Sequence, residues 1–293
     1  MTTIKERANA KINLYLDVLS KREDGFHEIK TVMHSVKFGD EITVTSVPAE
    51  KSTVKLIVTG CSFLPTDTRN IAVKAAYLFL ERAKLSCEVT IKMVKRIPVA
   101  AGLAGGSSDA AAVLRAMNKI YSKLFSVSAL SNLAAELGSD VAYCLYGKTA
   151  LCEGRGEKLT KISVMPKCAF VIAIANERVS TPFAYKELDR VYSDFSEEIE
   201  TGGEAHYQAL SKSLSDGNVD PKGLFNVFEK AVLPSCSGAS LIKEKLIELG
   251  AKGSLMSGSG PSVFGVFDNI EEAKAACQEL RKMKFKAYFA ESV

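Results

Sequence analysis

Residues 98–110 read Pro-Val-Ala-Ala-Gly-Leu-Ala-Gly-Gly-Ser-Ser-Asp-Ala, with three glycines and two serines among small side chains. An alanine-rich stretch with helical spacing follows, from about Ser107 to Tyr121. Unpaired N–H groups at the start of a helix favour an anion, and glycine allows a ligand to approach the backbone closely. The stretch therefore predicts a phosphate-binding loop. The alternative is that its small residues only permit close helix packing.

Two common nucleotide-binding patterns do not fit this chain. A Walker loop requires a glycine five residues before Gly147-Lys148-Thr149, and residue 142 is alanine. The dinucleotide pattern needs a third glycine, which is missing after Gly258-Ser259-Gly260 and after Gly154-Arg155-Gly156. The phosphate loop predicted at 98–110 is thus of another kind.

Composition sets limits on the function. The chain has 293 residues, enough for one large domain or two smaller ones, and 47% of them are hydrophobic. Its net charge is +4 without a block of Lys or Arg, which argues against nucleic-acid binding and mildly favours an anionic substrate. The N-terminus lacks the apolar core of a signal peptide, and the apolar run 169–175 is too short to span a membrane. These features predict a cytoplasmic protein without a membrane partner.

Cysteine and histidine usage gives no sign of a metal centre. The seven cysteines form no Cys-x-x-Cys pair, and the three histidines form no His-x-x-x-His face. We expect reduced thiols and no metal site built from protein ligands alone.

Apolar periodicity predicts an α+β fold. We expect helices over 70–84 (with Asn70 as N-cap), 107–121, 128–137 (ending at Gly138), 223–232 and 238–249, and one with Thr181-Pro182 as its cap and first turn. Strands are expected over 12–19, 41–47, 53–60, 87–95 and 169–175, with short buried segments around Gly147 and a loop or helix-containing insert over 193–222. The tail reads ββαβ over 252–256, 263–268, 270–282 and 285–290, which suits a ferredoxin-like sandwich.

The loop resembles the phosphate loop of the GHMP kinases, a family of small-molecule kinases that includes galactokinase, homoserine kinase and mevalonate kinase. Residues 8–14 (Ala-Asn-Ala-Lys-Ile-Asn-Leu) match the family's first motif, and residues 255–262 (Leu-Met-Ser-Gly-Ser-Gly-Pro-Ser) match its third. The resemblance implies a two-domain kinase. Residues 1–150 would form a ribosomal-S5-like α/β domain, and residues 151–293 a ferredoxin-like α/β domain.

Further segments are similar to one branch of this family. They are residues 10–14, the run from Arg22 to Glu28 that contains Gly-Phe-His, and Leu-Gly-Ser-Asp-Val at 137–141. The similarity implies that ATP phosphorylates the 2-hydroxyl of a methylerythritol carrying a diphosphocytidyl group, in the non-mevalonate isoprenoid route. Two residues depart from the branch pattern: Ala142 stands where proline is usual, and Phe26 lacks the hydroxyl of a tyrosine. Both can alter loop geometry or substrate affinity.

Phosphoryl transfer needs positioning, charge stabilisation and a proton acceptor. Asp140 lies in a Gly-Ser-Asp turn beside an apolar run, where a charge needs a partner, and Lys11 lies in an otherwise apolar strand start. The resemblance makes these two residues the catalytic pair, with Asp140 as general base. Without it, Asp140 would be read as a helix-end cap and Lys11 as a surface residue.

The other site residues follow from the resemblance. Mg²⁺ is expected with ATP. Phe26 and His27 would recognise the cytosine with Tyr185 as a second aromatic wall, Asn13 would contact the methylerythritol, and Thr181 would line the diphosphate. Asn70 and Lys95 would border the adenine, although Lys95 also reads as a solvated strand-end charge. The phosphates would lie on Pro98, Val99, Ala100, Ala101, Gly102, Leu103, Ala104, Gly105, Gly106, Ser107 and Ser108.

Two features near these residues allow more than one interpretation. Asp109 can position Mg²⁺ or stabilise the first turn of its helix through the helix dipole, and we favour the helix role. The glycine turn at 258–260 is either a simple hairpin or a support for the first loop, which we favour. Another GHMP kinase or an inactive ligand-binding relative remain the rival functions, and the chain is expected to be a monomer or homodimer.

Overall fold

The computed structural model describes residues 1–192 and 202–293. The strands are β1 (Thr2–Lys21), β2 (His27–Pro48), β3 (Thr53–Thr59), β4 (Cys87–Val94), β5 (Thr149–Gly154), β6 (Lys158–Lys161), β7 (Ala169–Ile174), β8 (Phe225–Asn226), β9 (Gly253–Met256), β10 (Ser262–Phe267) and β11 (Lys286–Glu291). The helices are α1 (Ile71–Ala83), α2 (Gly105–Ile120), α3 (Val127–Leu137), α4 (Ser139–Tyr146), α5 (Thr181–Val191), α6 (Gly203–Ser215), α7 (Phe228–Val232), α8 (Ser237–Glu248) and α9 (Ile270–Lys282).

The chain folds into two compact units that interleave in sequence. The first contains residues 1–10, 39–99 and 104–147, and the second contains residues 11–38, 100–103 and 148–293. The long strands β1 and β2 each give residues to both units. Compactness therefore assigns residues 11–38 and 100–103 to the same unit as the C-terminal half, whereas a domain boundary near residue 150 stays a prediction.

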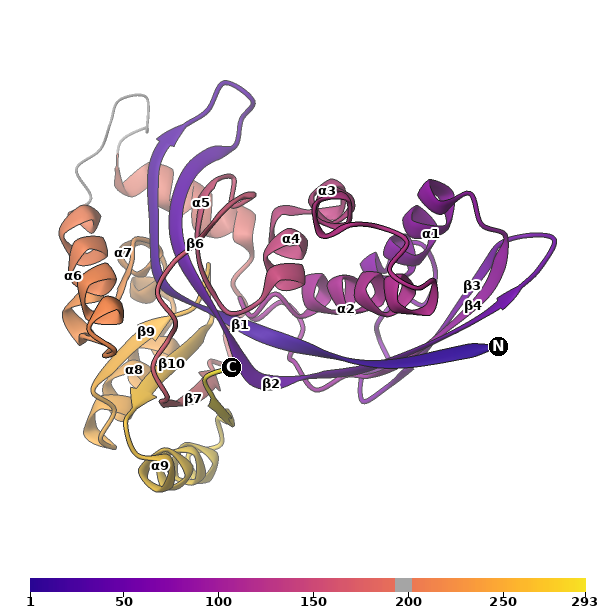
Figure 1. Ribbon diagram of the computed structural model, residues 1–293. Helices are drawn as coiled ribbons and strands as arrows, with labels where there is room; N and C mark the ends of the chain where they lie inside the picture. The colour runs from indigo at the N-terminus through magenta and orange to yellow at the C-terminus, as the bar shows by residue number, and fades with distance from the viewer. Residues whose placement is uncertain (193–201) are drawn as a thin grey trace. The chain divides into compact units, whose positions relative to one another are not determined.

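The first unit packs four helices beside a small sheet. β4 pairs with β3 in parallel and with the second half of β2 in antiparallel fashion. The helices α1 to α4 gather beside these strands (Figure 1). The neighbouring helices α1 and α2 bury several alanines: Ala72, Ala76, Ala111 and Ala112 are completely buried. Small side chains let two helices approach closely, so the alanine-rich sequence of α2 serves packing while its N-terminus carries the glycine loop.

The second unit is built on an antiparallel sheet with the strand order β11-β7-β10-β9. Every residue of β7 and β10 is buried. Side chains of α8 and α9, among them Ile242, Leu246 and Leu280, belong to the same hydrophobic core as Val171 and Val263 of the sheet. The ββαβ order of β9, β10, α9 and β11 confirms the ferredoxin-like tail.

Three element predictions need correction, and the insert over 193–222 contains a helix as expected. Residues 139–146 form helix α4 rather than a short buried segment, and Ser180 rather than Thr181 caps α5. The helix expected over 223–232 is reduced to α7, because the side chain of Asn226 accepts a hydrogen bond from the N–H of Phe228 and starts the helix there. Of the insert over 193–222, residues 203–215 form α6, and residues 193–201 lie outside the described part.

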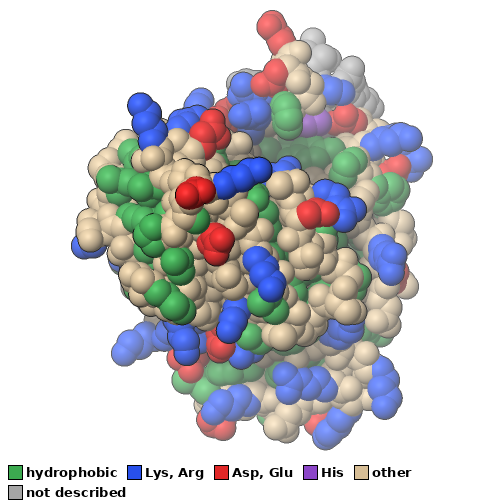
Figure 2. All heavy atoms as spheres, turned by 90° about the vertical axis from the view of Figure 1, so that its right-hand side faces the viewer, with side chains coloured by type: hydrophobic (Ala, Val, Ile, Leu, Met, Phe, Trp, Pro, Cys, Tyr) green, Lys and Arg blue, Asp and Glu red, His purple; other side chains and the backbone are tan. Residues whose placement is uncertain are grey.

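The surface carries both signs of charge in mixture. On the face drawn in Figure 2, Lys and Arg side chains are interspersed with acidic and uncharged ones, without a block of one sign. Among the described helices, none has both the length and the apolar character that crossing a bilayer requires. The mixed charges on this face agree with the absence of a Lys or Arg block in the sequence.

Candidate active site

The glycine loop joins β4 to α2, and every second residue from Ala100 to Ala104 has a left-handed backbone conformation. Ala100, Gly102 and Ala104 all have positive φ, of 54°, 73° and 52°. Ala104 is the N-cap of α2 and gives it no side-chain cap. The first N–H groups of the helix are thus left without an acceptor of this kind, which is the arrangement that binds anions at helix N-termini.

The two serines of the loop have different roles. Ser108 is 1% exposed and its Oγ donates a hydrogen bond of 2.6 Å to the carbonyl of Asn9. Ser107 is half-buried, and its hydroxyl makes no hydrogen bond within the described residues. Ser107 therefore has the hydroxyl that is available to a ligand, whereas Ser108 anchors the helix to β1.

Lys95 lies beneath the start of α2 and is not a solvated strand-end charge. Its Nζ donates hydrogen bonds of 2.6 Å to Oδ2 of Asp40 and 2.5 Å to Oδ2 of Asp109. All three side chains are buried. Burial lowers the pKa of Lys95, but the carboxylates of Asp109 and Asp40 outweigh this effect and raise it.

The helix role expected for Asp109 is wrong, because α2 begins at Gly105, two residues earlier than expected, and Asp109 lies beyond its first turn. Burial raises the pKa of this carboxyl to about 8, although Lys95 opposes the rise. Its Oδ1 is buried and has no hydrogen-bond partner among the described residues. Burial and the neighbouring Asp40 thus favour the protonated form of Asp109, whereas the hydrogen bond from Lys95 favours its carboxylate.

Lys11 begins a buried polar chain in the second unit. Its Nζ donates to Oδ1 of Asn13 at 2.6 Å, Asn13 donates to Oγ1 of Thr31 at 2.8 Å, and Thr31 donates to the carbonyl of Tyr15 at 2.6 Å. Lys11 and Asn13 are 5% and 3% exposed. The backbone N–H of Lys11 also donates to the carbonyl of Leu103 in the glycine loop. Lys11 is consequently held in a fixed geometry against that loop.

Asp140 stands in the first turn of α4, in the first unit. The turn follows Gly138, whose φ of 154° lets α3 end and α4 begin without a linker. Asp140 is half-buried and makes no hydrogen bond or ion pair within its own unit. A carboxylate in the first turn of a helix interacts favourably with the helix dipole, so the position suits an acidic side chain.

The second glycine turn packs against the first one. A Cβ at Gly102 would lie 2.3 Å from the carbonyl oxygen of Ser257, and the Oγ of Ser257 donates to the carbonyl of Gly102 at 3.1 Å. A Cβ at Gly258 would lie 3.5 Å from Nζ of Lys11. The buried Asn226 holds the turn by donating to the carbonyls of Met256 and Gly258. These contacts support the expectation that this turn stabilises the phosphate loop.

The residues predicted for cytosine recognition also gather in the second unit. The rings of His27 and Tyr185 stack with centroids 4.6 Å apart. Nε2 of His27 lies 2.8 Å from Oδ1 of Asp189, whose other oxygen accepts a hydrogen bond from Lys21. Tyr185 and Asp189 are four residues apart on α5, so one face of that helix orients the imidazole twice.

Phe26 is presented differently from His27. Its ring is 55% exposed, and the guanidinium of Arg155 lies over it at 5.0 Å. Thr181, at the start of α5, shares a hydrogen bond of 3.0 Å with Ser259 of the second glycine turn. Phe26 is thus the aromatic surface that solvent can reach, and Thr181 connects α5 with the second glycine turn.

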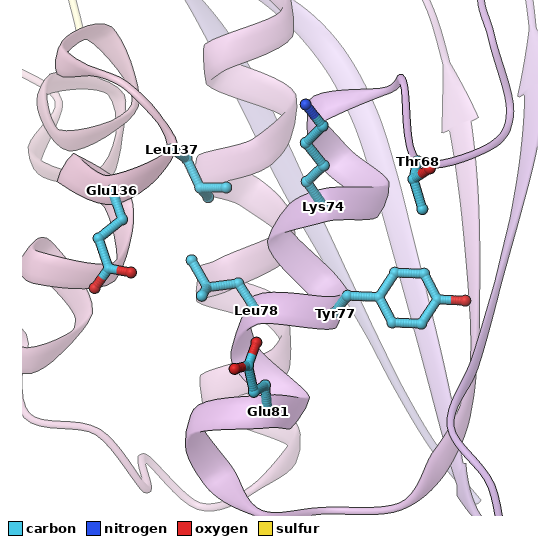
Figure 3. A pocket seen from close by; sticks show the side chains of 7 residues that line it. All are labelled: Thr68, Lys74, Tyr77, Leu78, Glu81, Glu136 and Leu137. Carbon is cyan, nitrogen blue, oxygen red and sulfur yellow. The ribbon is translucent and has the colours of Figure 1, made fainter.

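Asn70 caps α1 as expected, and both ends of its amide are occupied. Oδ1 accepts from the N–H of Ala72, and Nδ2 donates to the carbonyl of Pro65. A hollow of about 450 Å³ lies on the outer side of α1, against the end of α3 (Figure 3). No predicted site residue lines it, so the adenine contacts of Asn70 and Lys95 stay predictions. The hollow is lined by Thr68, Lys74, Tyr77, Leu78, Glu81, Glu136 and Leu137.

Several supporting residues were not singled out from the sequence. Asp40, Thr31, Asp189 and Asn226 are polar residues in or next to apolar runs, and that was the only signal that could have marked them. Their partners are distant in sequence: Asp40 and Lys95 are 55 positions apart, and His27 and Asp189 are 162 positions apart. Within the described residues, no group of three or more His, Cys, Asp or Glu side chains is placed to hold a metal ion.

Comparisons with known proteins agree with this geometry. Residues 70–148 match the family model described as GHMP kinases N terminal domain, and residues 205–285 match GHMP kinases C terminal. A homoserine kinase from Cytophaga hutchinsonii superposes over 100% of this chain and 95% of that chain, with a TM-score of 0.75 at 21% identity. Fold and loop together define a GHMP kinase, which is a small-molecule kinase.

Closer relatives define the family within this class. The chain is 38% identical to a 4-diphosphocytidyl-2-C-methyl-D-erythritol kinase of Acetivibrio thermocellus over 100% of both chains, and 40% identical to one of Clostridium botulinum over 97% of both. A solved 4-(cytidine 5'-diphospho)-2C-methyl-D-erythritol kinase matches 98% of both chains, with a TM-score of 0.81 and 32% identity. The chain belongs to the 4-diphosphocytidyl-2-C-methyl-D-erythritol kinase family.

Proposed function

We propose that this kinase transfers the γ-phosphoryl group of ATP to the 2-hydroxyl of 4-diphosphocytidyl-2-C-methyl-D-erythritol, giving the 2-phosphate and ADP. The observation that carries the proposal is the identity of 38–40% to kinases of this name over almost the whole chain. The cytosine-recognition residues add to it, because stacked and hydrogen-bonding rings suit a pyrimidine. The reaction would supply a step of the non-mevalonate isoprenoid route.

The N–H groups at the start of α2 and the hydroxyl of Ser107 would hold the ATP phosphates. The fit is good because this helix end has no side-chain cap and its neighbours are small. Mg²⁺, when bound with the nucleotide, supplies neutralisation of the phosphate charge. The ATP loop would thus be pre-formed by the fold and would need little rearrangement.

Asp140 would accept the proton of the acceptor hydroxyl as its oxygen attacks the γ-phosphorus. Lys11 would stabilise the charge on the transferring group and orient the acceptor with Asn13, to which it is hydrogen-bonded. The ammonium of Lys11 is fixed by Asn13 and by the backbone bond to Leu103, so its charge would need no reorganisation during transfer.

The test is ATP consumption with Mg²⁺ and a panel of acceptors. The panel contains the diphosphocytidyl compound, methylerythritol phosphate, mevalonate, homoserine and galactose. We expect turnover with the diphosphocytidyl compound alone. Turnover with another acceptor would keep the kinase class and exclude the cytosine assignment, whereas ATP binding without any turnover would indicate a ligand-binding relative.

A further inference from the structure

The two ends of the phosphate loop are attached to a single buried ammonium. Oδ1 of Asp40 accepts hydrogen bonds from the N–H groups of Arg96 and Ile97, which lead into the loop. Its Oδ2 binds Nζ of Lys95, and the same Nζ binds Asp109, where the loop has passed into α2. We call Asp40, Lys95 and Asp109 the loop clamp.

The loop clamp is almost completely buried. The three side chains are 0–4% exposed, so water cannot substitute for one of them. A buried ammonium that loses a partner is costly, and the hydrogen bonds are therefore kept in one arrangement. Such a cluster fixes distances more strictly than surface ion pairs do.

The clamp also explains one glycine of the loop. A Cβ at Gly105 would lie 3.1 Å from Nζ of Lys95 and 3.0 Å from Cγ2 of Ile97. Gly105 is the first residue of α2, so the ammonium passes directly beneath the helix end that the phosphates would use. Part of the glycine content of the loop thus serves the clamp rather than close approach of a ligand.

We propose that Lys95, held by Asp40 and Asp109, is a positioning residue that sets the shape of the phosphate loop and thereby the affinity for ATP. The inference rests on the proposed function only in taking ATP as the ligand of the loop. It gives the buried ammonium a role through the backbone of residues 96–105, without requiring that its Nζ touches the nucleotide.

Asp109→Ala is the decisive variant. It detaches the helix end from the clamp but leaves Lys95 and Asp40 as a charge-balanced pair, so we expect the protein to fold. A mispositioned loop is expected to weaken ATP binding about tenfold to a hundredfold, measured by calorimetry without acceptor. Asp109→Asn keeps the shape of the side chain and an oxygen that can accept the hydrogen bond from Lys95, and should restore ATP affinity to within about threefold of the parent protein.

Asp17→Asn is the matched control. Asp17 is an equally buried carboxylate, 2% exposed, whose Oδ1 accepts the N–H of Val18 away from the glycine loop. The Asp17→Asn substitution should lower the thermal midpoint without changing ATP affinity.

The proposal is overturned if folded Asp109→Ala binds ATP within about twofold of the parent. It is also overturned if the loss of ATP affinity follows the loss of thermal stability equally in Asp109→Ala and Asp17→Asn. If Asp109→Ala does not fold, the test rests on Asp109→Asn. A folded Asp109→Asn protein that binds ATP more than about threefold more weakly than the parent would then overturn the proposal, since the conservative change should preserve ATP affinity. ATP binding is measured without acceptor, so an error in the acceptor assignment leaves the result unchanged.

Discussion

Asp140 is the residue whose chemistry the proposed mechanism needs most directly. Asp140→Asn keeps the size of the side chain but removes its capacity to accept a proton. We expect kcat to fall by about 10²- to 10⁴-fold, with little change in the KM for ATP, because general-base catalysis contributes about that much. Initial-rate kinetics and a thermal melt of the same preparation measure this. Near-normal turnover would remove Asp140 from the base role.

Asp109 gives a pH dependence at the same scale. Its pKa is about 8 in the folded protein and 3.8 in the reference state, so between these values the folded state holds a proton that the unfolded state has lost. Stability from this group is therefore present at low pH and decreases as the pH rises toward 8. Asp109→Asn removes this titration. Lys95 and Asp40 are the charged groups that face it.

We expect the parent protein to gain stability relative to Asp109→Asn as the pH falls from 8 to 5, by up to about 1.4 kcal/mol per pH unit. Urea unfolding of both proteins at four pH values gives the difference directly. A difference that stays flat over this range would show that Asp109 is ionised in the folded state throughout.

At the scale of elements, Arg115 links the helix of the phosphate loop to the helix of Asp140. From α2 its guanidinium donates to Glu6 and to the backbone carbonyls of Cys144 and Arg7, the first of which lies near the end of α4. A lysine cannot make three such bonds from one planar group. Arg115→Lys should cost about 1–3 kcal/mol of stability and lower kcat several-fold, because α4 carries Asp140 in its first turn.

Lys119→Met is the control for this change. Lys119 also binds Glu6, but its side chain is 54% exposed, and surface ion pairs contribute little. Denaturant unfolding and kcat should both stay close to the parent values. If the two variants behave alike, the carbonyl contact to α4 has no special importance.

Substitutions at Gly102 and Gly25 separate the effect of a steric clash from the effect of backbone strain. Gly102→Ala places a methyl group 2.3 Å from the carbonyl oxygen of Ser257, whereas Gly25→Ala has a similar positive φ and nothing within 4 Å. Strain at φ > 0 costs about 1 kcal/mol at either site. Gly102→Ala should therefore destabilise well beyond Gly25→Ala and also raise the KM for ATP. Equal effects would mean that strain alone explains both.

Local periodicity predicted the elements well where apolar spacing was long and regular. The boundaries of α1, α3 and α8, with Asn70 and Gly138 as end signals, lie within one or two residues of the expectation. The segment around Asn226 failed because its shape depends on hydrogen bonds to the carbonyls of Met256 and Gly258, 30 and 32 residues away. The loop clamp escaped prediction for the same reason, since burial of Asp40 and Lys95 together is a tertiary property.

At the scale of the whole molecule, most residues proposed for the two substrates fall into different compact units. The start of α2 and the loop clamp belong to one compact unit, and Asn13, His27 and Tyr185 belong to the other; residues 100–103 of the glycine loop and the catalytic pair stand outside this division. If the first set binds ATP and the second binds the acceptor, substitutions should divide by substrate. Substitutions in the first set should then change the KM for ATP, and those in the second set the KM for the acceptor. This should hold even where two substitutions lower the stability of the folded protein by the same amount.

His27→Ala tests this division at the acceptor end. The imidazole is held by the ring of Tyr185 and by Asp189, and removing it leaves the recognising groups of a pyrimidine unpaired. We expect the KM for the diphosphocytidyl acceptor to rise about tenfold or more while the KM for ATP stays within about twofold. Asp189→Asn should move the same constant in the same direction but less, because it loosens the ring without removing it. Steady-state kinetics with each substrate varied in turn separates the two effects. A parallel rise in both constants would mean that these residues support the fold as a whole and do not select the acceptor.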